Sequence, residues 1–341
     1  MTTYHQFLQN IKNAPRITFL AKYFEDIASG RAMVPLEPVI ADTSLLRDKT
    51  AIFLYDHLKM KLGKFNEHCY ASIPYALENC IRIMTAIYHY SAEYKHKNAI
   101  TNFYVYEMGA GTGDITRILP EVTQGFITSL CSSATKANEI EFHKYKTNKN
   151  SYFYLGPYFN ISIDFLLNHN ELSCFSNGFD IIYERCTFQM YGADRENQIY
   201  HVSKILKDDG ILILDEKFLN ADFNEYLKRE KVKDDIFKSK YFDLSQIIEK
   251  QEVILNTMTK NLVSLKTLST ALQKNFKHAA VIWNSTNFYT VVASNSEYNI
   301  ERFIANMIQP CIPAEFNFEN NLPSKLHGLE DVHLAFSECD G

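Results

Sequence analysis

The sequence lacks the features that would direct a chain into or through a membrane. No uninterrupted apolar run approaches the ~18 residues that a membrane-spanning helix needs. The first residues, Met-Thr-Thr-Tyr-His-Gln, contain no basic segment followed by an apolar one, so they do not resemble a secretory signal. We therefore expect neither membrane insertion nor secretion, and we expect a cytoplasmic protein.

Features that favour nucleic acid or metal binding are also scarce. The formal net charge is -5 and the pI is about 6.1, so no overall basic field would attract a polyphosphate backbone. The seven cysteines are scattered, without a close pair, and the 11 histidines show no i, i+4 pairing near acids. We expect no nucleic-acid partner, no bound metal, and reduced thiols, as in a cytosolic protein.

What is present is the composition of a folded protein. The 341 residues are 46% hydrophobic and 22% charged, which is too apolar for a disordered chain. The length corresponds to roughly two domains, or to one large domain with additions. No internal repeat is apparent that would indicate a solenoid or a propeller.

Hydrophobic periodicity changes near residue 100. The first hundred residues carry helical periodicity, with helical runs near 7–11, 19–27, 45–60 and 75–94. From about 101 to 217, short apolar runs alternate with helical segments, which is typical of a parallel α/β sheet. The expected strands are 103–108, 125–130, 152–155, 179–184 and 211–215. We expect residues 205–210, which end at Gly210, to be a helix end with a glycine stop.

A second helical and charge-rich block follows, from about 218 to 277. Its charge run at 228–235 contains both signs, so we predict a solvated helix face there. Two strand-like runs come next, 278–283 and 288–294, and a connection this short makes them an antiparallel hairpin. The chain is therefore expected to be α/β, with a hairpin that closes the sheet.

A glycine-dense turn follows the first expected strand. Gly109, Gly111 and Gly113 lie between that strand and a helical segment. Ligands of open α/β sheets bind beyond the carboxyl ends of the strands, where glycines let backbone N–H groups approach them. A dinucleotide fingerprint would need its third glycine at position 114, which is Asp114. This spacing disfavours a nicotinamide or flavin dinucleotide.

The form Glu107-x-Gly109-x-Gly111-x-Gly113 resembles motif I of the class I S-adenosylmethionine-dependent methyltransferases. Residues 179–191 resemble the fourth-strand motif of that family, 205–216 its fifth strand, and 278–294 its antiparallel sixth and seventh strands. The later motifs are similar to the methyltransferase domains of polyketide and non-ribosomal peptide assembly lines. The resemblance implies a Rossmann-like sheet of seven strands, S-adenosyl-L-methionine as cofactor, and a place in secondary metabolism.

The resemblance also implies the cofactor contacts. The glycine turn would lie against the amino-acid part of the cofactor, and the acid before it would help to fix the ammonium group. The implied cofactor-binding residues are Glu107, Gly109, Ala110, Gly111, Gly113, Ser132, Tyr183 and Glu184. One feature departs from the family, because no acid stands in 125–133, where a carboxylate usually binds the ribose. Ser129, Ser132 or a backbone carbonyl could replace it, with weaker neutral hydrogen bonds.

Methyl transfer requires alignment of a nucleophile with the methyl group and exclusion of water, and a base is optional. The side chains placed at the ends of the fourth and fifth strands are Tyr183, Glu184, Arg185, Gln189, Glu216 and Lys217. Of these, the candidate catalytic residues are Glu184, Arg185, Gln189 and Glu216. Assembly-line relatives often carry a histidine where we align Gln189, which cannot take a proton, so a positioning role is expected for it. Glu184 and Arg185 could instead form a structural ion pair, and Cys186 is expected to be a buried structural thiol.

The resulting hypothesis is a methyltransferase that acts on a small-molecule or carrier-bound metabolite. Two alternatives stay open: a catalytically inactive methyltransferase-like binding protein, and a methyltransferase for a protein side chain. A nicotinamide-dependent oxidoreductase is disfavoured by the glycine spacing and the hairpin. We divide the chain into a helical region, 1–100, and a methyltransferase domain, 101–341. We expect the first region and the insertion at about 218–277 to cap the carboxyl edge of the sheet.

Overall fold

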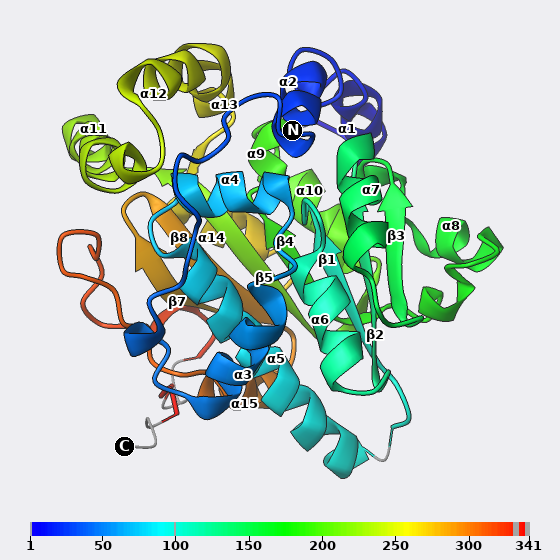
Figure 1. Cartoon of the computed structure of the whole chain (residues 1–341). Coiled ribbons are helices and arrows are strands. Elements are labelled where there is room, and N and C mark those ends of the chain that lie inside the picture. The colour runs from blue at the N-terminus through cyan, green and yellow to red at the C-terminus, as the bar shows by residue number, and fades with distance from the viewer. Residues whose placement is uncertain (1, 99, 330–333, 338–341) are drawn as a thin grey trace.

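The computed structural model describes residues 2–98, 100–329 and 334–337. Its centre is a sheet with helices on both faces (Figure 1). Among the described residues the strand order is β3-β2-β1-β4-β5-β8-β7-β9, and the short β6 pairs with the end of β5. The strands are β1 Phe103–Met108, β2 Ile127–Ser133, β3 Ser151–Leu155, β4 Phe179–Arg185, β5 Leu206–Leu219, β6 Val263–Ser264, β7 His278–Ser285, β8 Phe288–Ser294 and β9 Ser324–His327.

The directions of the strands confirm the expected fold class. β1 to β5 pair in parallel, whereas β8 pairs antiparallel with both β5 and β7. The path from β3 to β7 contains the seven expected strands, with the last hairpin antiparallel. Two further strands, which the sequence did not predict, are added: β9 pairs antiparallel with β7 at the outer edge, and the two-residue β6 comes from the helical insertion.

Both faces of the sheet are buried, as the apolar character of its strands requires. Ile181 and Ile213 belong to one hydrophobic core, and their neighbours Ile182 and Leu212 belong to the other. This alternation follows from the two-residue repeat of a strand. The helices that cover the sheet are α6 Asp114–Val122, α7 Lys136–Tyr145, α8 Ile163–Asn168, α9 Phe188–Tyr191, α10 Arg195–Ser203, α14 Leu265–Leu272 and α15 Glu297–Ala305.

Two further groups of helices come from the expected helical blocks. The first group is α1 Tyr4–Ile11, α2 Ala21–Ala28, α3 Lys49–Leu58, α4 Lys64–Ser72 and α5 Ala76–Asn98. The second is α11 Phe223–Val232, α12 Leu244–Lys250 and α13 Asn256–Thr259, with the π-helical segments η4 Lys233–Phe237 and η6 Gln251–Leu255. In Figure 1, α2, α4, α12 and α13 lie beyond the upper end of the sheet. Parts of both blocks are therefore placed at one edge.

The predicted helix end at 205–210 is wrong. α10 ends at Ser203, and Leu206 already pairs with Phe179 as the first residue of β5. The register between β4 and β5 shifts at this point. A Cβ added to Gly210 would lie 3.0 Å from the carbonyl oxygen of Asp180 and 2.8 Å from Leu206 Cδ1. The absence of a side chain at Gly210 therefore lets β4 and β5 lie close together at a bulge, and the glycine does not end a helix.

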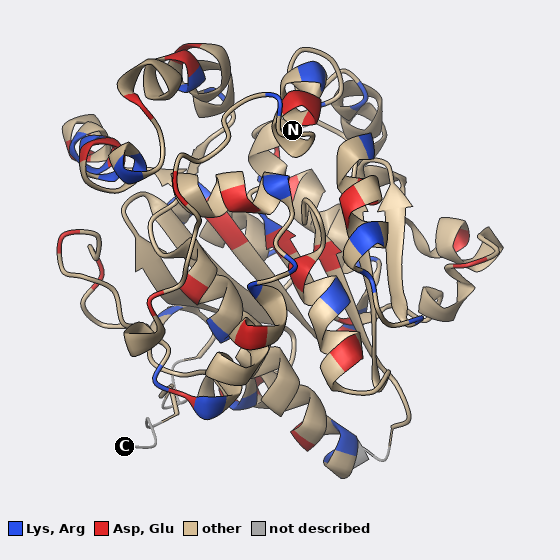
Figure 2. Ribbon diagram, in the orientation of Figure 1, with Lys and Arg blue, Asp and Glu red and all other residues tan. Residues whose placement is uncertain are grey.

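The predicted solvated charge run at 228–235 is also wrong for part of its length. Figure 2 shows both signs of charge along α11. Lys231 and Asp235 are exposed, but Arg229, Lys233 and Asp234 are buried. Arg229 of α11 donates hydrogen bonds to Thr286 and Tyr289, and η4 buries Lys233 and Asp234. Balanced charge predicts solvation only where no other element packs on the helix.

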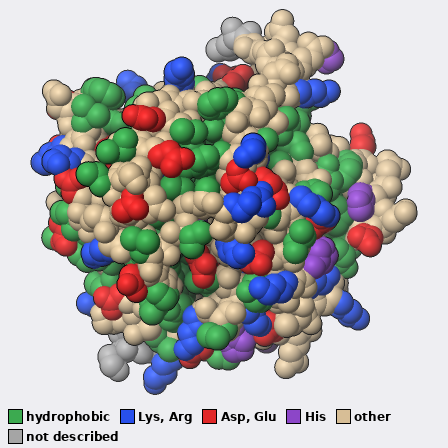
Figure 3. All heavy atoms as spheres, turned by 45° about the horizontal axis from the view of Figure 1, so that its top comes forward, with side chains coloured by type: hydrophobic (Ala, Val, Ile, Leu, Met, Phe, Trp, Pro, Cys, Tyr) green, Lys and Arg blue, Asp and Glu red, His purple; other side chains and the backbone are tan. Residues whose placement is uncertain are grey.

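The outer surface shows no gathering of charge by sign in the view of Figure 3, where acidic and basic side chains lie among apolar ones. Within the described ranges, no helix combines the length and the apolar character that crossing a membrane requires. The six described cysteines are free, and Cys339 lies outside the described residues.

Candidate functional site

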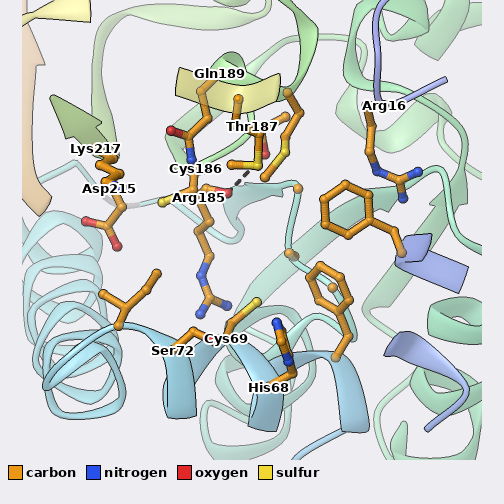
Figure 4. Close-up of a pocket in the computed structure, with 18 of the residues that line it drawn as sticks. Arg16, His68, Cys69, Ser72, Arg185, Cys186, Thr187, Gln189, Asp215 and Lys217 are labelled. Atoms are coloured by element: carbon orange, nitrogen blue, oxygen red, sulfur yellow. Dashed lines mark hydrogen bonds between the residues drawn. The ribbon is translucent and has the colours of Figure 1, made fainter. Parts of the chain in front are cut away.

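A cavity of about 180 Å³ lies at the carboxyl edge of the sheet. It is lined by the glycine turn after β1, by the ends of β2, β4 and β5, by α4, and by the second helical block. The sheet order reverses here, since β1 lies between β2 and β4. Open α/β sheets bind ligands at this switch point, beyond the carboxyl ends of their strands. Figure 4 shows side chains from opposite walls pointing into the space.

The glycine turn forms one wall of the cavity. Gly109, Ala110 and Gly111 line it, and the two glycines have φ values of +71° and +58°. A Cβ on Gly111 would lie 2.0 Å from Asn66 Oδ1, which accepts a hydrogen bond from Thr112 N. Left-handed backbone and close approach of α4 therefore both require glycine. Gly113, which directly precedes α6, does not line the cavity, and a Cβ on it would point at Cys131.

Glu107, the acid before the turn, is fully buried and does not line the cavity. It accepts hydrogen bonds from the amide and the hydroxyl of Thr116, at 3.0 and 2.9 Å. Its other oxygen forms an ion pair with Arg185 Nη1 at 2.8 Å. The carboxylate therefore fixes the start of α6 and the Arg185 side chain, and Arg185 stands between it and the cavity.

Two of the four candidate catalytic residues line the cavity, Arg185 and Gln189. Arg185 extends from the end of β4 toward α4 (Figure 4), where Nη2 donates to the hydroxyl of Tyr70 at 2.8 Å. Gln189 is buried, and its Oε1 has no hydrogen-bond partner among the described residues. A buried acceptor without a partner, in the wall of a cavity, is suited to a ligand that donates a hydrogen bond.

The other two candidates, Glu184 and Glu216, lie beneath the cavity wall. Glu184 accepts hydrogen bonds from the amides of Thr187 and Phe188, the latter at 2.9 Å. Burial, and then the charge of Glu216, raise the pKa of Glu184 well above its ordinary value. Glu216 pairs with Arg195 Nε at 2.9 Å. Both acids hold the loop after β4 and the end of β5, and they do not face the cavity.

Tyr183 also lies outside the cavity wall, with its hydroxyl donating to Asp215. At the end of β2, Ser132 lines the cavity, and its hydroxyl lies 2.6 Å from that of Tyr106. Gly156 and Tyr158, which follow β3, continue the same wall. The cavity thus extends from the glycine turn past Ser132 to the end of β3, without a carboxylate at the end of β2.

Sequence reasoning missed much of the opposite wall. The helix α4 was not predicted, and it contributes Asn66, His68, Cys69 and Ser72 to the cavity. Its buried side chains are largely polar, so it lacks the apolar stripe by which surface helices are recognised. Four lysines also line the cavity: Lys217, Lys233, Lys238 and Lys250. The sequence placed Lys217 at the end of the fifth strand, whereas the other three were not among the candidates.

Lys250 and His68 form a buried polar contact. Lys250 Nζ lies 2.7 Å from His68 Nε2 and 2.8 Å from Ser72 Oγ. His68 Nδ1 lies 3.0 Å from the carbonyl oxygen of Met33, so it donates there and Nε2 accepts from the lysine. Burial, and then Lys250, hold the pKa of His68 well below its ordinary value. The imidazole is therefore neutral at physiological pH.

Comparison with known proteins gives weak similarities in structure and none in sequence. The sequence matches no family model and no curated protein. The plantazolicin methyltransferase BpumL, in complex with a pentazolic desmethylPZN analogue and S-adenosylhomocysteine, is 10% identical with a TM-score of 0.43. That match covers 63% of this chain and 85% of the other.

A second similar structure is an S-adenosylmethionine-dependent methyltransferase from Geobacter sulfurreducens, also in complex with S-adenosylhomocysteine. It is 9% identical with a TM-score of 0.33, and the match covers 64% of this chain and 71% of the other. No residue role in this chain follows from similarities of this size. The strand order and directions stand independently of them, and they are those of a Rossmann-like class I methyltransferase sheet.

Proposed function

We propose that the protein is an S-adenosylmethionine-dependent methyltransferase that acts on a small molecule. One observation carries the proposal: a single cavity joins the glycine turn and Ser132 to the side chains of both helical blocks. The first part is placed to hold a nucleoside-containing cofactor at the switch point of the sheet. The second part is placed to hold an acceptor beside it.

The residues fit the cofactor in two respects. The turn brings Gly109 and Gly111 into the cavity without side chains, and Ser132 offers a hydroxyl where a ribose would lie. Arg185, with its guanidinium between Glu107 and Tyr70, is placed to meet the carboxylate of the methionyl part. The chemistry that S-adenosylmethionine supplies when bound is an electrophilic methyl group on a sulfonium.

The chain's own contribution would be to align the acceptor with the methyl group and to exclude water from the cavity. Gln189 Oε1 can accept a hydrogen bond from the acceptor and hold its nucleophilic atom in line. Phe24 and Phe65 of the first block, with Ile254 and Met258 of the second, give the cavity apolar walls. We propose that the regions 1–100 and 218–277 act in this way as a cap on the domain 101–341.

The direct test is calorimetric titration of the full chain with S-adenosylhomocysteine. We expect one site per chain in the wild type and no binding to Gly111→Asp, whose side chain would collide with Asn66 and enter the cavity. Ile140→Asp is the matched control, because it adds the same acid at an exposed position of α7 that does not line the cavity. Absence of binding to the wild type at millimolar ligand would refute the proposal.

A second candidate function is a methyltransferase-like binding protein without catalysis. The observation that favours it is the end of β2, where Ser132 and Ser133 stand in place of an acid. Neutral hydrogen bonds to a ribose are weaker than those of a carboxylate. Binding of S-adenosylhomocysteine in the titration would exclude the form of this candidate that has lost its cofactor.

A further inference from the structure

The four lysines of the cavity wall form a buried cluster together with two acids. Lys217 comes from β5, Lys233 from η4, Lys238 from the turn after it, and Lys250 from the end of α12. The first three are at most 3% exposed. The partner acids are Glu230, at the end of α11, and Asp234. Elements distant in the sequence thus bring ammonium groups to one place beside the cavity.

The charges of this lysine cluster do not balance. Glu230 Oε2 lies 2.6 Å from Lys217 Nζ and 2.5 Å from Lys233 Nζ, so one carboxylate serves two lysines. Asp234 Oδ1 lies 2.9 Å from Lys238 Nζ, at an angle that makes no hydrogen bond. Asp234 Oδ2 accepts a hydrogen bond from Gln251.

Lys250 has no carboxylate partner among the described residues, and its contacts are His68 and Ser72. The cluster therefore contains four amines and two carboxylates. Asp215, the acid that lines the same cavity, is already hydrogen-bonded by Tyr183 and Thr290. Buried ammonium groups are costly unless negative charge or hydrogen bonds compensate them.

The titration of the cluster reflects this shortage of negative charge. Burial, and then Lys233, lower the pKa of Lys238 to about 8. Burial, and then Lys238, lower the pKa of Lys250 well below its ordinary value. An anion placed among these amines would reverse both effects, since opposite charge favours the protonated form.

We propose that the methyl acceptor is an anion, whose carboxylate or phosphate group is bound by Lys238 and its neighbours in the lysine cluster. This inference rests on the proposed function. The rest of that wall is apolar, with Ile254, Leu255 and Met258 beside the lysines. The acceptor is therefore an apolar body with an acidic group, which the cluster holds away from the glycine turn.

The cofactor also has a carboxylate. The test must therefore distinguish binding of the acceptor's acidic group by the lysines from binding of the cofactor's carboxylate. Arg185 pairs with Glu107, two residues before the glycine turn, whereas the lysines come from β5 and the second helical block. Replacement of Lys238 should therefore weaken binding of the acceptor anion and leave the affinity for the cofactor unchanged. A parallel loss of both affinities would show that the lysines hold the cofactor carboxylate, and would overturn the inference.

The probes are benzoate and phenyl phosphate, with neutral benzamide as the matched control ligand. Each is titrated against the full chain, with and without saturating S-adenosylhomocysteine, by ligand-observed NMR. We expect at least one of the two anions to bind and benzamide not to bind. Lys238→Met should lower the affinity for the anion about tenfold or more. Lys238→Arg should retain most of the affinity, and Lys228→Met, at an exposed lysine of α11, should change nothing.

The pH dependence gives a second readout. Lys238 is faced by Lys233 and Asp234 of η4, Glu230 of α11, Lys250 of α12 and His68 of α4. Lys217 of β5 shares Glu230 with Lys233. An anion binds its protonated form, so affinity should be full below about pH 8 and should fall as the pH rises above that value. Lys238→Met should shift or remove this fall.

The outcomes separate the two claims. Failure of S-adenosylhomocysteine to bind the wild type would refute the proposed function. Binding of S-adenosylhomocysteine, together with equal affinities for benzoate, phenyl phosphate and benzamide, would refute the anionic acceptor alone. An unchanged anion affinity in Lys238→Met, in a variant whose melting temperature equals that of the wild type, would refute it as well.

Discussion

The ion pair between Arg185 and Glu107 gives the sharpest prediction for stability. Glu107 is fully buried, and Arg185 is the cation that reaches it, at 2.8 Å. Arg185→Met would leave the carboxylate with the hydrogen bonds of Thr116 and no opposite charge. Breaking a buried pair in this way typically costs about 3 to 5 kcal/mol. We expect a loss of that size in the free energy of unfolding at pH 7.5, measured by urea denaturation.

The loss should depend on pH. Burial already raises the pKa of Glu107 in the wild type, against the lowering effect of Arg185. Without Arg185 that pKa rises further, so the folded variant binds more protons than its unfolded chain. Stability then increases as the pH falls toward the raised pKa. The difference between wild type and Arg185→Met should therefore shrink at pH 5.5.

Two controls make the result interpretable. Arg185→Met combined with Glu107→Gln removes both charges, and it should recover part of the lost stability. Arg31→Met, in a pair with Asp26 whose arginine is 60% exposed, should cause no measurable change. A loss below about 1 kcal/mol, or a loss that stays constant between pH 7.5 and 5.5, would refute the role assigned to Arg185.

Two further predictions concern packing. Gln189→Leu removes a buried oxygen that has no hydrogen-bond partner among the described residues. We therefore expect the free energy of unfolding of the chain without ligand to rise by about 1 kcal/mol, measured as a higher melting temperature. An equal or lower melting temperature would contradict this. Gly210→Ala forces a Cβ to within 3.0 Å of the carbonyl oxygen of Asp180 and should cost about 1 to 3 kcal/mol in urea unfolding. Lys228→Ala, at an exposed position of α11, should cost less than about 0.5 kcal/mol, and equal losses in the two variants would argue against the close strand contact.

The sheet could be predicted from the sequence because its signals are local. The expected strand at 103–108 is β1 residue for residue, and the glycine turn follows it as expected. The runs of apolar residues at β4, β7 and β8 are equally plain, since each is buried on both faces. Local pattern therefore predicted the strands, the antiparallel hairpin and the glycine turn whose Gly109 and Gly111 line the cavity.

The remainder depends on contacts between distant segments. A stretch such as Lys64–Ser72 has little hydrophobic periodicity, because the side chains that it buries, such as Asn66 and His68, are largely polar. The buried lysine Lys233 and its neighbour Asp234 have the same local sequence character as a solvated helix. They are buried because η4 packs over the end of β5, near Lys217. Similarly, the shift of register near Gly210 is a property of the pairing between β4 and β5, which the local sequence of β5 does not show.

Glu184 and Glu216 show a related limit. Both lie at strand ends, which is where catalytic acids are expected. Neither lines the cavity, and each is bound within the protein, Glu184 to the amides of Thr187 and Phe188 and Glu216 to Arg195. Neighbouring side chains of a strand point to opposite faces of the sheet. A shift of one position therefore decides whether a side chain at the strand end lines the cavity or packs beneath its wall.

The central claim is that this edge of the sheet holds S-adenosylmethionine. A crystal structure of the full chain grown with S-adenosylhomocysteine tests it most directly. We predict density for the ligand in the cavity, with its amino-acid part against Gly109 and Gly111 and its ribose beside Ser132. A cavity without ligand in crystals soaked at millimolar S-adenosylhomocysteine, or ligand bound elsewhere on the chain, would contradict the account.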